Sequence, residues 1–136
     1  METNRMAMNG EISKKAIIVE DNLILSLLYE NYLKEMVFKT VGEITSGEKA
    51  VELVKKYTPD VVIMDIMLDG KIDGVEAAAE IRKFSSAPIV FITANTDPAH
   101  LKRAENITNS KFLRKPISED KLKKAVNYLL SGKPKV

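Results

Sequence analysis

The stretch VVIMDIMLDG (residues 61–70) places one aspartate, Asp65, in the middle of an apolar run. A continuous apolar run of this length is typical of a strand buried on both faces, as in a parallel sheet. A carboxylate in such surroundings costs free energy unless a partner compensates its charge. The stretch therefore predicts a central strand over residues 61–66. It leaves a structural and a functional role for Asp65 equally open.

Four further apolar runs alternate with segments of helical periodicity. Strands are expected at residues 16–19, 38–44, 89–93 and 111–114. Five β–α units imply a parallel sheet covered by helices on both faces. The sequence thus predicts one α/β domain over residues 14–132. A polar, flexible tail is expected at residues 1–13, and a short C-terminal tail at 133–136.

Capping residues mark where the helices between these strands are expected to begin. The predicted N-caps are Asn22, Thr45, Asp73, Asp97 and Ser118. Glu residues three positions after Thr45 and Asp73 complete two capping boxes. In the first helix, a stripe of apolar residues at helical spacing is expected to face the core: Ile24, Leu27, Leu28 and Leu33.

Composition excludes several classes of protein. The 136 residues contain no cysteine, which excludes disulfides and thiolate chemistry and fits a cytoplasmic location. No apolar stretch approaches the roughly 20 residues that cross a bilayer, so no membrane insertion is expected. The net charge of +2 gives no reason to expect direct binding of nucleic acid. The last quarter of the chain is rich in Lys and Arg, which suits an acidic partner or a merely solvated surface.

Polar residues follow the predicted strands at the point where each strand ends. They are Glu20 and Asp21, then Asp65, Thr93 and Lys115. Ligands of doubly wound sheets bind beyond the carboxyl ends of the strands, so these side chains are expected to converge. Oxygen ligands without His or Cys favour Mg²⁺, beside which an aspartate can attack phosphorus. Each residue alone fits a structural role, but the set favours a phosphoryl-transfer site.

Four motifs in order resemble the receiver domain of two-component response regulators. The acidic pair lies in IIVEDN, the central aspartate in VVIMDIML, a Thr in FITA and a Lys–Pro pair in FLRKPI. The resemblance runs from about residue 14 to residue 130. It implies a flavodoxin-like, doubly wound (βα)5 fold whose five-stranded parallel sheet has the order 2-1-3-4-5.

The resemblance also implies a role for each matching residue. Asp65 would accept phosphate from a sensor histidine kinase or a phosphotransfer protein. Mg²⁺, or Mn²⁺ as a substitute, would be bound by Asp21 and Asp65 directly, by Glu20 through water, and by the backbone carbonyl of Met67.

The phosphoryl group would be contacted by Lys115, Thr93 and the backbone of Ala94. Thr93 and Phe112 would move on activation, and the Lys115–Pro116 peptide bond is often cis in this family. Output would pass through the face of the fourth helix, fifth strand and fifth helix to a separate, unknown partner protein. The chain would be a monomer, or would form a weak dimer through the same face.

Two features depart from the family pattern. Asp69 stands where many members carry proline, and the loop from Asp65 to Gly74 is one residue longer than in chemotaxis-type members. Met67 and Asn95 are expected to flank the path of the water that hydrolyses the phosphorylated form, and therefore to modulate its lifetime.

Two other classes of function remain as alternatives. A hydrolase of the haloacid-dehalogenase type would need a second aspartate two residues after Asp65, where this chain has Met67. A phosphate-independent interaction module would not need the acidic pair, Thr93 or Lys115. We therefore expect a stand-alone regulatory domain, limited to self-phosphorylation and self-dephosphorylation, and not an enzyme acting on other molecules.

Overall fold

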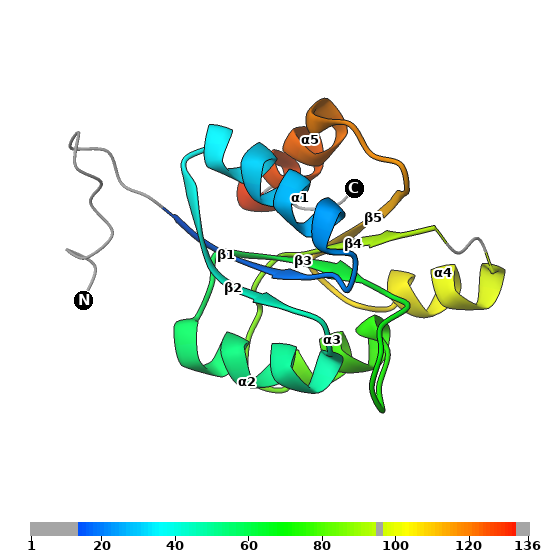
Figure 1. Cartoon of the computed structure of the whole chain (residues 1–136). Helices are drawn as coiled ribbons and strands as arrows, with labels where there is room; N and C mark the ends of the chain where they lie inside the picture. The colour runs from blue at the N-terminus through cyan, green and yellow to red at the C-terminus, as the bar shows by residue number, and fades with distance from the viewer. Residues whose placement is uncertain (1–13, 95–96, 133–136) are drawn as a thin grey trace.

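Five parallel strands form one sheet in the order β2-β1-β3-β4-β5 in the computed structural model, which describes residues 14–94 and 97–132 (Figure 1). The strands are β1 (Lys14–Val19), β2 (Phe38–Ile44), β3 (Val61–Asp65), β4 (Ile89–Thr93) and β5 (Ser110–Arg114). The helices are α1 (Leu23–Glu35), α2 (Gly47–Tyr57), α3 (Gly74–Ile81), α4 (Pro98–Glu105) and α5 (Glu119–Leu130). The predicted fold class and strand order are confirmed. The predicted tails at 1–13 and 133–136 lie outside the described residues.

Helices cover both faces of the sheet. Helices α1 and α5 lie on one face, and α2, α3 and α4 lie on the other (Figure 1). In β3, Val61 and Ile63 belong to the apolar cluster under α1 and α5, whereas Val62 and Met64 belong to the cluster on the opposite face. Successive strand residues point to opposite faces, so a strand with apolar residues throughout must be covered twice. Within the described residues, no helix is both long enough and apolar enough to cross a membrane.

The first helix buries a different face from the predicted one. Ser26, Tyr29 and Leu33 are buried, whereas Ile24 is 77% exposed and Leu27 is 52% exposed. The helix carries apolar residues on most of its circumference, so periodicity alone does not select the buried side. The prediction that Ile24, Leu27 and Leu28 face the core is therefore wrong, and only Leu33 of that stripe is buried.

The start of α2 also differs by one residue from the prediction. Ser46, and not Thr45, is the N-cap, and its hydroxyl accepts a hydrogen bond from the backbone N–H of Lys49 at 3.2 Å. The Glu48 carboxylate does not close a capping box. It accepts a hydrogen bond from the backbone N–H of Lys71 at 2.9 Å, in the loop between β3 and α3. The helix is thereby tied to the loop that follows Asp65.

Glycine is required where α3 meets the end of β3. The backbone N–H of Gly74 donates to the carbonyl of Ile66 at 2.7 Å, and a Cβ at position 74 would overlap the carbonyl oxygen of Asp65. Gly70, in the same loop, has a φ of +105°, a conformation that side chains rarely adopt. The loop is therefore fixed at its α3 end, directly against the strand that carries Asp65.

Candidate functional site

Three carboxylates converge at the carboxyl end of the sheet, as predicted. Each of Glu20, Asp21 and Asp65 offers an oxygen within 4.8 Å of the others. The first two follow β1 and the third ends β3, and these strands are neighbours in the sheet. Glu20 and Asp65 are buried, whereas Asp21 is exposed. Parallel strands bring their carboxyl ends to one edge, which is why residues distant in sequence meet here.

Lys115 supplies the positive charge at this cluster. Its Nζ lies 2.9 Å from Asp65 Oδ2 and 2.9 Å from Glu20 Oε1, and its side chain is only 16% exposed. The residue follows β5, and its backbone N–H donates to the carbonyl of Thr93 at 3.0 Å. The Lys115–Pro116 peptide bond is cis. One ammonium group thus bridges two buried carboxylates.

Burial and charge act against each other in this cluster. Burial raises the pKa of the Glu20 carboxyl above its usual value, by more than the contact with Lys115 lowers it. Burial also lowers the pKa of the Lys115 ammonium, but contacts with Asp65 and Glu20 outweigh burial and leave this pKa above its usual value. The nearby hydroxyl of Tyr29 in α1 has its pKa raised to about 12, chiefly by burial. The cluster therefore holds one lysine firmly charged beside an excess of carboxylates.

A shallow hollow opens over the cluster. Its volume is about 340 Å³, and it is lined by Asp65, Met67, Thr93, Ala94 and Lys115. The backbone N–H of Met67 donates to Asp65 Oδ1 at 3.2 Å, while the Met67 side chain is 47% exposed. Asp65 is thus held in place by its neighbours and still faces a space large enough for a small anion.

Of the two predicted switch residues, Thr93 lines this hollow and Phe112 does not belong to its lining. Thr93 is buried at the end of β4, directly beside the exposed Ala94. Phe112 lies in β5 opposite Phe91 of β4, half-buried, and packs against the apolar cluster on the side of α2, α3 and α4. Asn95, predicted to modulate the site, lies outside the described residues.

The donor set fits a hard cation. All three acidic side chains present oxygen, and no His or Cys belongs to the cluster. Glu20 Oε1 contacts Lys115 as an ion pair but accepts no aligned hydrogen bond from the described residues. A buried oxygen in this state is suited to accept a hydrogen bond from a metal-bound water. The residues present therefore suit Mg²⁺.

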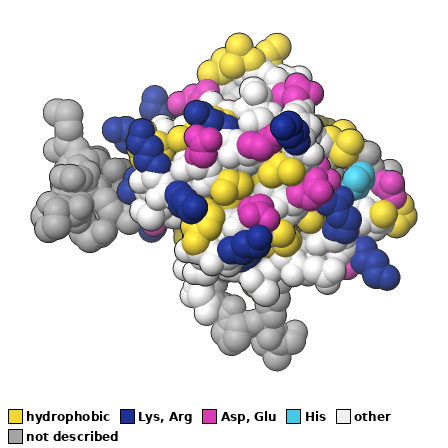
Figure 2. Space-filling view, turned by 90° about the horizontal axis from the view of Figure 1, so that it is seen from below, with side chains coloured by type: hydrophobic (Ala, Val, Ile, Leu, Met, Phe, Trp, Pro, Cys, Tyr) yellow, Lys and Arg dark blue, Asp and Glu magenta, His cyan; other side chains and the backbone are white. Residues whose placement is uncertain are grey.

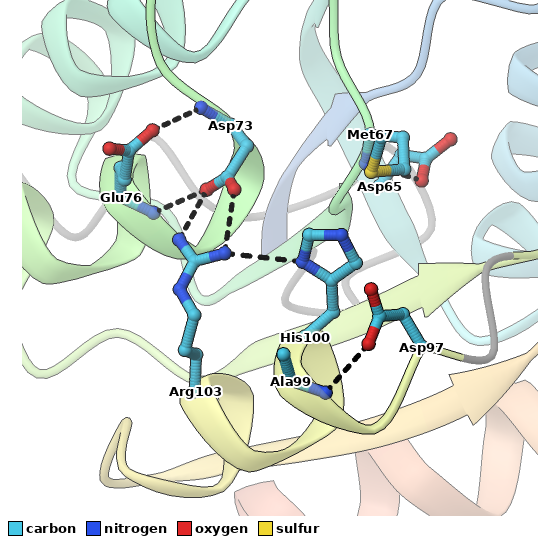
Figure 3. Close-up of polar contacts among 8 residues, drawn as sticks. All are labelled: Asp65, Met67, Asp73, Glu76, Asp97, Ala99, His100 and Arg103. Carbon is cyan, nitrogen blue, oxygen red and sulfur yellow. Dashed lines mark hydrogen bonds and ion pairs between the residues drawn. The ribbon is translucent and has the colours of Figure 1, made fainter.

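Sequence reasoning missed an ion pair that joins the loop after Asp65 to α4. The Arg103 guanidinium donates to both carboxylate oxygens of Asp73, at 2.9 and 3.0 Å, and contacts His100 Nδ1 at 3.2 Å (Figure 3). Asp73 also caps α3 by accepting from the backbone N–H of Glu76 at 2.8 Å. Both Arg103 and His100 project from α4 toward this loop (Figure 3). The spacing of 30 residues gives no sequence signal for the pair.

A second missed feature is an apolar row on α1. Four leucine and isoleucine side chains are exposed directly after the acidic pair: Leu23, Ile24, Leu27 and Leu28. Exposed apolar side chains that gather in one patch mark sites of interaction. The row borders the carboxylate cluster along the chain, because Asp21 and Asn22 are the only residues between Glu20 and α1.

Known proteins were compared with the chain in sequence and in structure. The family described as the response regulator receiver domain matches residues 16–127. The transcriptional regulatory protein PdtaR of Mycobacterium tuberculosis is 33% identical over 123 residues, covering 90% of this chain and 60% of PdtaR. The chemotaxis protein CheY of Halobacterium salinarum is 30% identical over 122 residues, covering 89% of this chain and 100% of CheY. The chain thus spans about 60% of the length of one relative and all of the other.

Solved structures agree with the sequence comparison. A response regulator receiver protein from Sinorhizobium medicae has a TM-score of 0.79 and 28% identity, over 88% of this chain and 96% of that one. The receiver domain of a modulated diguanylate cyclase from Desulfovibrio desulfuricans has a TM-score of 0.77 and 29% identity, over 89% and 99%. With a carboxylate cluster at the carboxyl end of a 2-1-3-4-5 sheet and a family match over most of its length, the chain belongs to the response regulator receiver domain family.

Proposed function

We propose that the chain is a phosphorylation-activated switch in which Asp65 accepts a phosphoryl group from a phosphohistidine of a kinase or phosphotransfer protein. The single observation that carries the proposal is the placement of Asp65, which forms an ion pair with Lys115 and faces the open hollow. A carboxylate oxygen of Asp65 forms the new bond to phosphorus. The bond from phosphorus to the histidine nitrogen breaks, and the imidazole leaves with the bonding electrons.

Mg²⁺ would be held by Glu20, Asp21, Asp65 and the backbone carbonyl of Met67, and Mn²⁺ would substitute for it. When bound, the ion would neutralise charge on the phosphoryl oxygens. The clustering of the three carboxylates within 4.8 Å supports this assignment. Asp21 is the exposed member of the cluster and would therefore be the first ligand to meet an incoming ion.

Lys115, Thr93 and the backbone of Ala94 would contact the transferred phosphoryl group. All three line the same hollow as Asp65. Lys115 Nζ already lies 2.9 Å from Asp65 Oδ2, so it needs only a small movement to follow a phosphoryl oxygen attached there. A preorganised ammonium is effective at such a site because it does not have to be recruited during the reaction.

The apolar row on α1 would form part of the surface that meets the phosphodonor protein. A donor histidine has to come within bonding distance of Asp65, so the donor must touch the rim of the hollow. The row begins two residues after Asp21 and offers exposed Leu and Ile side chains. Apolar contact beside a charged site gives affinity without competing for the phosphoryl group.

Output would pass through the face formed by α4, β5 and α5 to a separate protein. Phosphorylation would draw Thr93 toward the phosphoryl group, and Phe112 would follow and repack this face. A partner that prefers one arrangement would shift the population toward it, by no more than its difference in affinity for the two states. The chain would be a monomer, or would form a weak dimer through the same face.

A small acyl phosphate or phosphoramidate tests the phosphoacceptor assignment. With Mg²⁺ present, we expect a mass gain of one phosphoryl group in the wild type and none in Asp65→Asn. An Asp69→Asn variant is the control and should still be modified, because Asp69 is a loop carboxylate four residues away in sequence. Turnover of phosphomonoesters would instead indicate the hydrolase alternative, and absence of any reaction would indicate the phosphate-independent module.

Met67 and Asn95 would set the lifetime of the phosphorylated form. Met67 lines the hollow with an exposed side chain, and Asn95 follows Thr93 by two residues. Met67 would therefore flank the approach of water to phosphorus, and we propose the same role for Asn95 from its position in the sequence. Exchanging both residues should change the rate at which the phosphoryl group is lost, and an unchanged rate would refute their role.

A further inference from the structure

The apolar row on α1 gathers most of the large apolar side chains that are exposed in residues 14–94 and 97–132. The others are Val37, Met67 and Phe84, which belong to three separate segments. The sequence from Asn22 to Tyr29 contains no charged residue, so no charge interrupts the row. A patch of this kind on the surface of a domain marks a site of interaction.

The face of the molecule that contains α2 and α3 has a different character. Its apolar side chains are separated by acidic and basic ones (Figure 2). Some of the charges form ion pairs, such as Lys49 with Glu52 in α2. The exposed ring of Phe84, which follows α3, lies 5.0 Å from the ammonium group of Lys55. An uncharged patch is thus a property of α1 and not of the surface in general.

A groove lies toward the other end of the same helix, between α1 and β2. It has a volume of about 480 Å³, and we call it the α1–β2 groove. Helix α1 contributes Leu27, Asn31 and Lys34 to its lining, and β2 contributes Phe38 and Lys39. Because β2 is an edge strand, no further strand of the described sheet covers this side.

The row and the groove share the outward side of α1. Ile24, Leu27, Asn31 and Lys34 follow one another at spacings of three or four residues, and all four are exposed. Residues at these spacings lie on one side of a helix. The helix therefore presents a protruding apolar side chain, Ile24, near its start and a recess near its end.

We propose that two copies of the chain associate by pairing α1 with α1 in antiparallel orientation, about a two-fold axis between Leu27 and Leu28. Ile24 of each copy would enter the α1–β2 groove of the other, beside Asn31. Ile24 and Asn31 are equally far from this axis along the helix, so a single two-fold operation forms the contact twice. The interface would use a different surface from the face of α4, β5 and α5.

The charges at the two ends of α1 favour the antiparallel orientation. The carboxylate cluster with the exposed Asp21 lies at its start. Lys34 and Lys39 line the groove at its end, and Glu30 is the only acid in that lining. Asp21 and Lys34 are also equally far from the proposed axis, so each would face the other across the interface. Opposite charges at such a contact favour association and fix its register.

A membrane surface is a poorer occupant of the apolar row. Helices that lie on membranes carry Lys and Arg beside their apolar face. Here the acids Asp21 and Glu30 stand just before and just after the row. Nucleic acid would meet the carboxylate cluster and leave the apolar side chains without a partner. A second copy matches the protruding side chain, the recess and both charged ends.

The expected dimer is dissociable. One helix packed against one helix buries less than the roughly 800 Å² per partner of a standard interface. The second copy would lie beside Asp21 and would cover the row on which a phosphodonor protein is proposed to dock. The donor would then have to displace the second copy. This consequence, unlike the dimer itself, rests on the proposed function.

Analytical ultracentrifugation of the whole chain tests the proposal, over a range of concentrations and with EDTA so that Asp21 is free of metal. The wild type should show a monomer–dimer equilibrium. Ile24→Glu should weaken the dimer at least roughly tenfold, because it places a charge in the apolar contact. Phe84→Glu is the control and should dimerise like the wild type, because this exposed residue lies outside α1. Circular dichroism and thermal unfolding check that both variants are folded.

An exchange of charge tests the orientation of the two helices. Lys34→Glu and Asp21→Lys should each weaken the dimer about fivefold, because each brings like charges together. The variant that carries both substitutions restores opposite charges and should dimerise like the wild type. Lys56→Glu is the control for Lys34→Glu and should have no effect, since each of these lysines lies in the last turn of its helix.

Amide chemical shifts locate the interface. With rising concentration, they should change in α1 and at the start of β2. The proposal is overturned if the wild type stays monomeric at millimolar concentration, or if Ile24→Glu dimerises as tightly as Phe84→Glu. It is also overturned if the double exchange of Asp21 and Lys34 restores nothing, or if anionic vesicles bind the row in preference to a second copy.

Failure of this proposal is distinguishable from failure of the phosphoacceptor proposal. Dimerisation is measured on the unphosphorylated protein without metal, and it does not depend on Asp65. Phosphoryl uptake from a small acyl phosphate is read from mass and needs no protein on α1. A chain that gains a phosphoryl group but remains monomeric retains the proposed switch and refutes the dimer. A chain that dimerises through α1 but is not modified retains the dimer and refutes the switch.

Discussion

Lys115 compensates the charge of two buried carboxylates. Its ammonium lies 2.9 Å from each of Glu20 and Asp65, and both carboxylates are almost fully buried. Removing one partner of a buried pair leaves an uncompensated charge, which costs more than the pair itself contributes. Single substitutions in this cluster therefore report on electrostatics more than on packing.

Lys115→Met should lower the free energy of unfolding by about 3 kcal/mol in metal-free buffer, because two carboxylates lose their cation. Urea unfolding measures the change. Lys123→Met in α5, an exposed position, is the control and should stay within about 0.5 kcal/mol of the wild type. Equal stability of the two variants would contradict the bridging role of Lys115.

The same lysine predicts a difference at alkaline pH. Since the pKa of Lys115 is raised in the folded state, its contribution is complete below the usual pKa of lysine and is lost as pH rises through the raised value. On the alkaline side, the stability gap between wild type and Lys115→Met should therefore stay constant up to the usual pKa of lysine and narrow only above it. A gap that already narrows below the usual lysine range would contradict this assignment.

Val37 occupies a backbone conformation that disfavours its side chain. It follows the C-cap of α1 with a φ of +67°, and a β-branched residue with positive φ is an outlier. Its side chain is 40% exposed, so replacement sacrifices little burial. Val37→Asn should raise the free energy of unfolding by about 0.5–1 kcal/mol, since asparagine tolerates this region. A Val37→Thr variant keeps the branch and should show no gain in the same urea unfolding measurement.

At the scale of elements, the ion pair between Asp73 and Arg103 fastens α4 to the start of α3. Asp73 has two tasks, because it caps α3 and accepts both hydrogen bonds from Arg103. Helix α4 follows Ala94, which lines the hollow over Asp65. A contact that restrains α4 therefore restrains an element of the proposed output face.

A double-mutant cycle separates the two tasks of Asp73. Asp73→Ala should cost about 1 kcal/mol for the lost cap in addition to the lost ion pair. Arg103→Met should cost below about 1 kcal/mol, since the arginine side chain is 38% exposed. The coupling energy from urea unfolding should be positive, and hydrogen exchange should quicken in α4 for both variants. Strictly additive effects would mean that the pair does not couple the two helices.

The coupling energy between Asp73 and Arg103 should fall as the pH is lowered. Burial alone would raise the pKa of Asp73. The hydrogen bonds from Arg103 and from the backbone N–H groups that Asp73 caps outweigh burial, so this pKa lies below its usual value. Its contribution is therefore complete above the usual range for aspartate and is lost as pH falls through the lowered pKa. The coupling energy should persist at mildly acidic pH and vanish in strong acid. Loss of coupling already at mildly acidic pH would contradict this direction.

Element boundaries show what the sequence pattern could and could not predict. The five strands were predictable because apolar runs bounded by polar residues leave few alternatives. The buried face of α1 was not, because apolar residues surround that helix and the neighbouring α5 and sheet decide which side is covered. Thr45 and Ser46 are both capable N-caps, and the extent of β2 decides between them. The sequence therefore identifies the residues that can cap or be buried, and the packing of distant elements decides which of them are.

At the scale of the whole molecule, membership of the receiver family makes this chain a domain of phosphorylation-based two-component signalling and not an enzyme in the ordinary sense. The convergence of Glu20, Asp21, Asp65 and Lys115 was predictable, because the carboxyl ends of parallel strands share one edge. The Asp73–Arg103 pair and the exposed row on α1 were not, since both depend on how helices lie against the sheet.

Mg²⁺ should stabilise the folded chain through its carboxylate cluster. A ligand that binds only the folded state adds about 2.7 kcal/mol at one hundred times its dissociation constant. We expect a rise in the thermal midpoint with Mg²⁺ for the wild type and a much smaller rise for Asp21→Asn. Asp60→Asn, a carboxylate at the opposite end of β3, is the control and should respond like the wild type. An equal response of all three would place the ion elsewhere.

The close backbone contact between Gly74 and the end of β3 determines where the chain can tolerate changes in length. Both ends of the connection are anchored, at Asp65 and at the first residue of α3, and the backbone of Lys71 is held by Glu48. An added residue therefore has to be absorbed between Met67 and Asp73. A spectroscopic label attached to the side chain at position 69 should accordingly report on the neighbourhood of the proposed phosphorylation site without moving Asp65.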